Sequence, residues 1–103
     1  MPKLGSIVPD MENRTTTAGP FDKAVAGALR SAIGERFMTQ ADVAKRAGVA
    51  PRTFARYFMG TSPMPVAKLV EVCDAIGVDP GEILNAARVI LERTEKEAGR
   101  KVE

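Results

Sequence analysis

Two arginines, Arg52 and Arg56, stand four residues apart in the stretch APRTFARYFMG, with Thr53 beside them. A spacing of four places both guanidinium groups on one face of a helix. The major groove of DNA admits a helix, and an arginine can donate two hydrogen bonds to guanine O6 and N7. The phosphates attract the same charges whatever the base sequence. The stretch therefore favours a DNA-reading helix, but the pattern alone also fits a solvated polar face.

The other side of this expected helix is aromatic. A helix advances about 100° per residue, which places Phe54 and Phe58 together and opposite Arg52 and Arg56. We therefore expect the two phenylalanines to anchor the helix in a core and the arginines to point outward.

The residues before this helix predict how it is held. Thr39 can cap a preceding helix, with Asp42 three residues on as its reciprocal partner. Gly48 suits the left-handed position that ends a helix, and Pro51 suits the first position of the next. The break between them predicts a helix-turn-helix over about 39–58, in which the first helix braces the second.

The rest of the chain predicts further helices and no strand. Apolar residues recur at helical spacing from Phe21 to Ile33 and from about Pro65 to Ile76, and a start signal at Asp79-Pro80-Gly81-Glu82 opens a helix to about Glu97. The expected fold is all-α, with about five helices. It divides into a flexible, disordered N-terminal arm (1–19), a DNA-binding domain (20–87) and an extension of the last helix (88–103) whose end, 95–103, is a frayed charged tail.

Composition narrows the function classes. Histidine is absent and Cys73 is the single cysteine, which removes histidine acid–base chemistry, histidine metal sites and an internal disulfide. No nucleophile–base pair or metal set appears, so an enzyme and a cofactor are not expected. Cys73 lies on an apolar helical stripe and is expected to be buried. No apolar run approaches the length of a membrane span and no signal peptide is visible, so we expect a cytoplasmic protein.

Charge is unevenly distributed along the chain. The net charge is only +2, but residues 39–58 carry four basic residues against Asp42 alone, a net charge of +3. Residues 59–103 carry six basic and eight acidic residues, a net charge of −2. The small total therefore hides a basic helix pair, which favours a polyanionic partner for that part of the chain.

Beyond these patterns, a combination of residues points to a known family. Its members are Gln40, Val43-Ala44, the turn Gly48-Val49, Gly60 and the run LVEVCDAIGVDPGEIL. In this combination the chain resembles the helix-turn-helix domain of the lambda repressor and Cro (XRE-type) family, over about Phe21 to Ala87. The resemblance implies a transcriptional repressor that binds double-stranded operator DNA, and the compact form is similar to temperate-phage immunity repressors, which would act in the bacterial host cytoplasm.

The resemblance also implies roles for single residues. The base-reading positions would be Pro51, Arg52 and Arg56. Gln40 would contact phosphate and buttress the first of these positions. Thr53 would touch the DNA backbone or a base edge. Phosphate contacts would come from Thr61 and Ser62. Proline cannot hydrogen-bond a base, so Pro51 is left with contact to a thymine methyl.

Several residues keep two interpretations. Tyr57 either fills the core or turns its hydroxyl to a phosphate, and Lys45 and Arg46 either touch phosphates or are a solvated face. Lys3 and Arg14 of the arm either enter the minor groove or have no role. The last helix either closes the core or pairs with a second copy, as suits palindromic sites, through Ile83, Ala87, Ile90, Leu91 and Thr94.

A second function class stays open beside the repressor. An antitoxin-like module would neutralise a protein partner and use DNA binding only to regulate its own synthesis. The stretch beyond Leu91 is short for a partner-binding tail, which weighs against this alternative. No small-molecule effector pocket is apparent from the sequence, so control would come from the amount of protein.

Overall fold

The predicted all-α class is confirmed in the part of the chain that the structure describes. The computed structural model describes the backbone of residues 18–102 and the side chains of residues 18–99. This part contains no strand and five helices: α2 (Pro20–Glu35), α3 (Gln40–Ala47), α4 (Pro51–Met59), α5 (Val66–Ile76) and α6 (Pro80–Val102). The predicted arm contacts from Lys3 and Arg14 lie outside the described residues.

The start of α3 follows the predicted capping box. The backbone N–H of Asp42 donates to Thr39 Oγ1 at 3.1 Å, and the N–H of Thr39 donates to Asp42 Oδ2 at 3.4 Å. These two bonds satisfy two of the donors that a helix start leaves without a partner. The side chains of Val43 and Ala44 then face inward and are buried. Local sequence thus fixes both the start of α3 and the face that it buries.

The turn between α3 and α4 is built around a left-handed glycine. Gly48 has φ 71°, which glycine adopts without steric cost, and the N–H of Val49 donates to the carbonyl of Ala44 at 3.0 Å. Ala50 precedes α4 and forms no side-chain capping bond. The helix α4 is therefore held by packing, above all by Phe54, which is 1% exposed.

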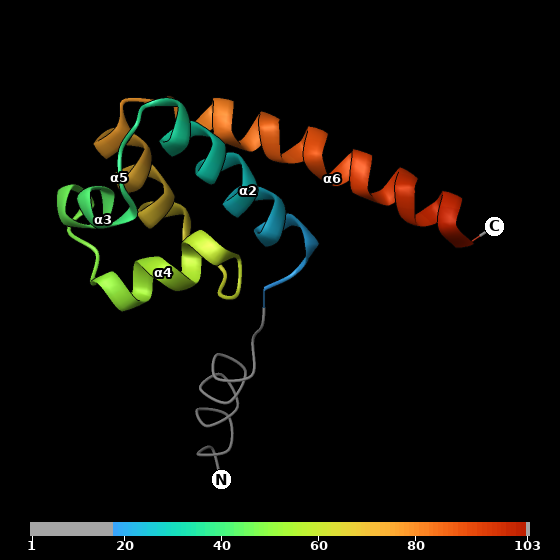
Figure 1. Ribbon diagram of the computed structural model, residues 1–103, viewed down its shortest axis with the longest axis horizontal. Coiled ribbons are helices and arrows are strands. Elements are labelled where there is room, and N and C mark those ends of the chain that lie inside the picture. The colour runs from blue at the N-terminus through green and yellow to red at the C-terminus, as the bar shows by residue number, and fades with distance from the viewer. Residues whose placement is uncertain (1–17, 103) are drawn as a thin grey trace, which may run out of the picture.

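The core lies where α2 meets the other helices. Figure 1 shows α2 between α4 and α6, with α3 beside α5. Phe21 departs from the prediction, because it lies at the edge and is 38% exposed although the apolar stripe of α2 begins with it. The largest fully buried side chains are Phe54, Leu29, Val43, Val72 and Cys73.

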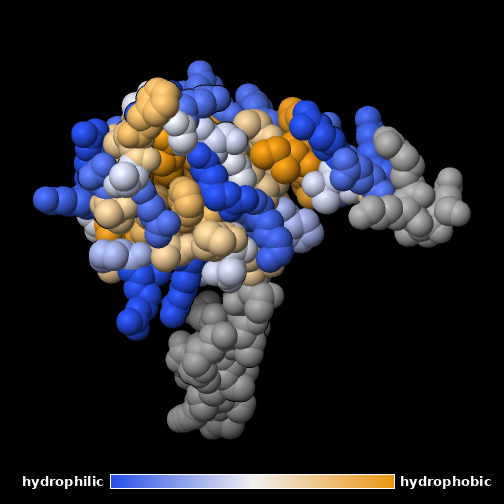
Figure 2. All heavy atoms as spheres, in the orientation of Figure 1, coloured by the Kyte–Doolittle hydropathy of each residue, from blue (hydrophilic) through white to orange (hydrophobic). Residues whose placement is uncertain are grey.

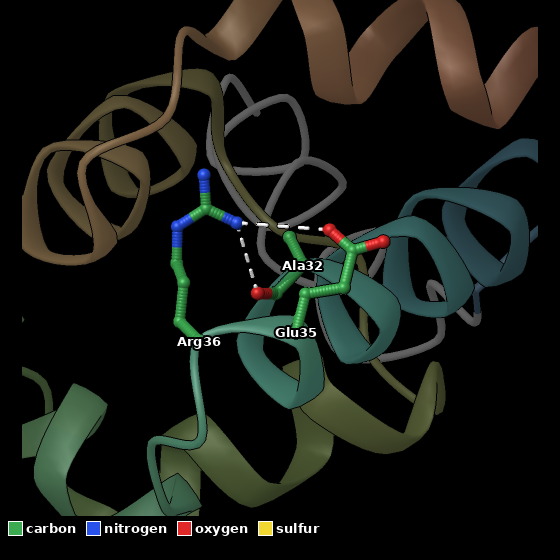
Figure 3. A network of polar contacts seen from close by, with 3 residues as sticks. All are labelled: Ala32, Glu35 and Arg36. Atoms are coloured by element: carbon green, nitrogen blue, oxygen red, sulfur yellow. Dashed lines mark hydrogen bonds and ion pairs between the residues drawn. The ribbon is translucent and has the colours of Figure 1, made fainter.

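The C-terminal end of α2 is closed by a basic side chain. Arg36 Nη1 donates to the carbonyl of Ala32 at 3.1 Å and lies 3.9 Å from Glu35 Oε1 (Figure 3). A positive charge at the C-terminal end of a helix interacts favourably with the helix dipole. The chain then leaves α2 through Phe37, which has φ 54° and a side chain that is 94% exposed. The bend that leads into α3 therefore places a bulky residue in a conformation usually taken by glycine.

The predicted frayed tail is wrong for residues 95–102. The helix α6 continues to Val102 and extends past the other helices (Figure 1). Its last turns are rich in lysine, arginine and glutamate, which favour helix. Glu92 also stands four residues before Lys96, a spacing that stabilises an exposed helix. Charge alone is therefore a poor sign that a helix ends.

Cys73 is fully buried, as its place on an apolar stripe predicts. Burial raises the pKa of its thiol to about 11, and the negative charges of Asp74 and Asp79 add to the rise. Because the thiolate is the reactive form, we expect no reaction of native protein with a thiol reagent such as dithionitrobenzoate at pH 8. Absorbance should show one thiol per chain only after denaturant is added, and stoichiometric labelling of native protein within minutes would contradict the buried position.

Candidate nucleic-acid interface

The outer face of α4 carries the two arginines. Arg52, Thr53 and Arg56 are exposed, and the buried Phe54 lies on the other side of the helix. The ring of Phe54 packs against that of Phe58 with centroids 5.9 Å apart. The predicted division of α4 into a core side and a polar side is thus seen in the structure. That the arginines contact bases stays a prediction.

Tyr57 belongs to the core and not to the outer face. Only 9% of its surface is exposed, and it packs within the main apolar cluster, whereas Phe58 is only partly buried against that cluster. Of the two interpretations of Tyr57, the structure supports the core position. The residue therefore presents little surface to a phosphate, and the alternative in which its hydroxyl contacts a phosphate is not supported.

The first turns of α3 and α4 lie next to each other. Gln40 and Pro51 line the same shallow hollow, together with Ala41 and Ala44. Gln40 is half-buried there and Pro51 is exposed. This arrangement brings the predicted phosphate-binding glutamine beside the first predicted reading position, as the family resemblance implies.

The loop after α4 is tied back to the helix. Gly60 ends α4 with φ 76°, and the N–H of Thr61 donates to the carbonyl of Arg56 at 3.0 Å. The hydroxyl of Thr61 donates to the same carbonyl at 3.3 Å, so it must rotate before it can donate to a phosphate. Thr61 is exposed and Ser62 is half-buried. The backbone of this loop is therefore fixed relative to the helix that carries Arg56.

Lys45 and Arg46 are exposed in the last turn of α3, where a positive charge interacts favourably with the helix dipole. No ion pair within residues 18–99 involves either side chain. Figure 2 shows strongly hydrophilic side chains projecting below the part of the molecule where Figure 1 shows α4. The basic character predicted for residues 39–58 is thus presented at the surface.

Two basic residues of α2 that lie at this interface were not predicted from the sequence. Lys23 and Arg30 donate hydrogen bonds to backbone carbonyls at the end of α4. Their spacing of seven places them on one side of α2, which is the only indication that the sequence offers. Nothing in the sequence shows that this side faces α4.

The residues predicted for a dimer interface fall into two groups. Ile83 and Ala87 are 3% and 0% exposed because they pack into the chain's own core, so they have no surface to offer a second copy, and this part of the prediction is corrected. Ile90 and Leu91 are only partly buried, and Thr94 is exposed with its hydroxyl donating to the carbonyl of Ile90 at 2.9 Å. Only this second group is accessible.

Residues 18–102 contain neither a candidate metal site nor a helix that could span a membrane. No three histidine, cysteine, aspartate or glutamate side chains gather there in a way that could hold a metal ion. None of the helices α2–α6 combines the length and the apolar character that crossing a membrane requires.

Comparison with known proteins agrees with this geometry. Residues 28–87 match the model of the Cro/C1-type HTH (helix-turn-helix) DNA-binding domain. A crystal structure of the clp gene regulator ClgR from C. glutamicum is similar with a TM-score of 0.64 and 25% sequence identity, covering 66% of this chain and 88% of that one. A second crystal structure of ClgR has a TM-score of 0.71 over 81% of this chain and 90% of that one, and at 22% identity it shows the fold alone. No curated protein is significantly similar in sequence. Because the matched residues make up more than half of the chain, the protein belongs to the Cro/C1-type helix-turn-helix DNA-binding family.

Proposed function

We propose that the protein is a sequence-specific regulator of transcription that binds double-stranded operator DNA and represses by occupying it. The observation that carries this proposal is the exposed face of α4, where Arg52 and Arg56 stand one turn apart on a helix held from behind by Phe54. Membership of a DNA-binding family and the similarity to ClgR, a gene regulator, support it.

The binding mode follows from the geometry of the helix pair. The helix α4 would lie in the major groove with its arginines toward the guanine edges, because that groove distinguishes all four base pairs. Gln40, Thr61 and the exposed basic residues of α3 would contact the flanking phosphates and set the register. The bound protein would then exclude polymerase from an overlapping promoter. The narrower role of a temperate-phage immunity repressor rests on the resemblance alone.

Selection from a pool of random duplex DNA tests the proposal. After several rounds at near-physiological salt, sequencing of the bound DNA should reveal one enriched motif. The motif is expected to contain guanines, because each arginine can form a bidentate contact with that base. If only salt-sensitive binding without an enriched motif appeared, the proposal would fail and the antitoxin-like interaction module would become the better hypothesis.

We also propose that two copies pair through α6, so that two α4 helices reach successive major grooves. Val89 is 50% exposed, and with Ala28, Ala86 and Ile90 it lines a groove between α2 and α6. Exposed apolar side chains on a helix that borders a groove suit burial against a second copy. A two-fold dimer of this kind would favour a palindromic operator.

Replacing Val89 by glutamate should convert the dimer into a monomer, because a buried carboxylate without a partner is costly. Sedimentation equilibrium should show the mass of one chain for Val89→Glu and of two chains for the parent protein. Asn85→Glu is the matched control, since Asn85 is exposed on α6 and does not line the groove between α2 and α6. A dimer that survives Val89→Glu, or a parent protein that is monomeric at micromolar concentration, would refute pairing through this surface.

A further inference from the structure

The C-terminal end of α4 is fastened to α2 by two long-range hydrogen bonds. Arg30 Nη1 donates to the carbonyl of Phe58 at 2.7 Å, and Lys23 Nζ donates to the carbonyl of Gly60 at 3.4 Å. Between these bonds the end of α4 lies close to α2. A Cβ built on Gly60 would be 3.3 Å from Lys23 Cα and 3.3 Å from Ala26 Cβ. The end of α4 therefore rests directly on α2.

These bonds add to the hydrogen bonding at the end of α4. A helix leaves its last carbonyls without partners inside the helix. The carbonyls of Arg56 and Tyr57 accept from the N–H groups of Thr61 and Gly60, at 3.0 Å and 3.1 Å. The carbonyl of Phe58 accepts from Arg30 instead. The bond is short and charge-assisted, and it brings a cation to the negative end of the helix dipole.

The same helix α2 also packs against α6. Gly27, which lies between Lys23 and Arg30 in the sequence, faces Ile90 of α6, whose Cδ1 is 3.7 Å from a Cβ built on the glycine. Figure 1 shows α2 between the other two helices. The C-terminal end of α4 is thus placed relative to the rest of the domain by its attachment to α2, and the carbonyl that accepts from Arg30 lies two residues from Arg56.

We propose that Arg30, assisted by Lys23, is a positioning residue for operator recognition: it fixes the C-terminal end of α4 so that Arg56 meets its base in bidentate geometry. The inference rests on the proposed function. A bidentate contact needs the helix placed to within about half an ångström, whereas attraction to phosphates tolerates larger shifts. Release of the end of α4 should therefore weaken specific binding and leave non-specific binding nearly unchanged.

A direct phosphate contact is the competing role for Arg30, because its side chain is exposed. The two roles predict different salt dependence. Removing a phosphate contact lowers the slope of log affinity against log salt by about one and weakens all sequences alike. Removing a positioning bond leaves that slope unchanged and weakens the specific site.

The test uses the full chain carrying Arg30→Met, which keeps a long apolar stem and removes the donors. Arg30→Lys should restore part of the function, because an ammonium can also donate to a carbonyl. Arg88→Met is the matched control, since it removes the same charge from an exposed position on α6. Fluorescence anisotropy at several salt concentrations gives Kd for the selected site and for an unrelated duplex, and circular dichroism confirms that each variant is folded.

For Arg30→Met we expect a loss of roughly tenfold in affinity for the selected site, less than about a twofold change for the unrelated duplex and an unchanged salt slope. Equal losses on both duplexes with a slope reduced by about one would overturn the proposal in favour of a phosphate contact. Unchanged binding would overturn it as well. If Arg30→Met unfolds, Lys23→Met carries the same test with a smaller expected loss. A parent protein that prefers no sequence would refute the proposed function itself.

Discussion

Replacing both Arg52 and Arg56 by alanine should abolish sequence preference and leave the fold intact. Each bidentate contact to guanine discriminates by about 1–3 kcal/mol, so each arginine should contribute roughly 5- to 150-fold to the preference for the selected site. Loss of both should bring that site close to the affinity of unrelated DNA. Binding to unrelated DNA should weaken less, because other basic residues still attract the phosphates.

The fold should persist because both arginines are exposed, and no hydrogen bond or ion pair within residues 18–99 involves either side chain. Competition between the selected duplex and a scrambled duplex measures the preference, and thermal melting followed by circular dichroism measures the fold. Arg88→Ala serves as the control for loss of charge. If the double variant kept its preference, α4 would not be the reading helix, and if it unfolded, the assignment of these residues to the surface would be wrong.

Phe54→Ala should have the opposite effect and destabilise the domain itself. Its side chain is 1% exposed and packs against Phe58, and truncating such a phenylalanine costs about 3–5 kcal/mol. A small domain has only about 5–15 kcal/mol of stability, so much of it should be lost. Urea unfolding followed by circular dichroism should show a large fall in the midpoint, and DNA binding should weaken only in proportion to the fraction unfolded.

Phe37→Ala is the matched control for that experiment. It deletes the same aromatic ring from a position that is 94% exposed. The change should alter the free energy of unfolding by less than about 0.5 kcal/mol, as is usual at the surface. Similar losses for Phe37→Ala and Phe54→Ala would contradict the division of aromatic residues between surface and core.

Local chemistry is the part of the fold that sequence predicts well. The capping bonds of Thr39 and Asp42 and the left-handed Gly48 involve residues within a few positions of one another, so they depend little on the rest of the molecule. The exposed face of α4 also follows, because Arg52, Thr53 and Arg56 lie on the side of the helix away from Phe54 and Phe58. These features are enough to predict the helix pair and its outward surface.

The remaining differences arise from tertiary packing. Helical spacing shows that Phe54, Tyr57 and Phe58 lie toward one side, but the line along which α4 meets α2 decides that Tyr57 is buried and Phe58 only partly so. The bonds from Arg30 and Lys23 join residues 28 and 37 positions apart, and no local pattern reports them.

The most direct test of base reading by α4 is to replace each guanine of the selected site in turn by 7-deazaguanine and to measure Kd. This base lacks the N7 acceptor in the major groove and leaves the minor groove and the phosphates unchanged. We predict that 7-deazaguanine at one or more positions clearly weakens binding of the parent protein. At each such position, the replacement should have no further effect on the variant that lacks the arginine contacting that guanine, which is either Arg52→Ala or Arg56→Ala. If no 7-deazaguanine weakened binding, the arginines of α4 would not read guanines in the major groove.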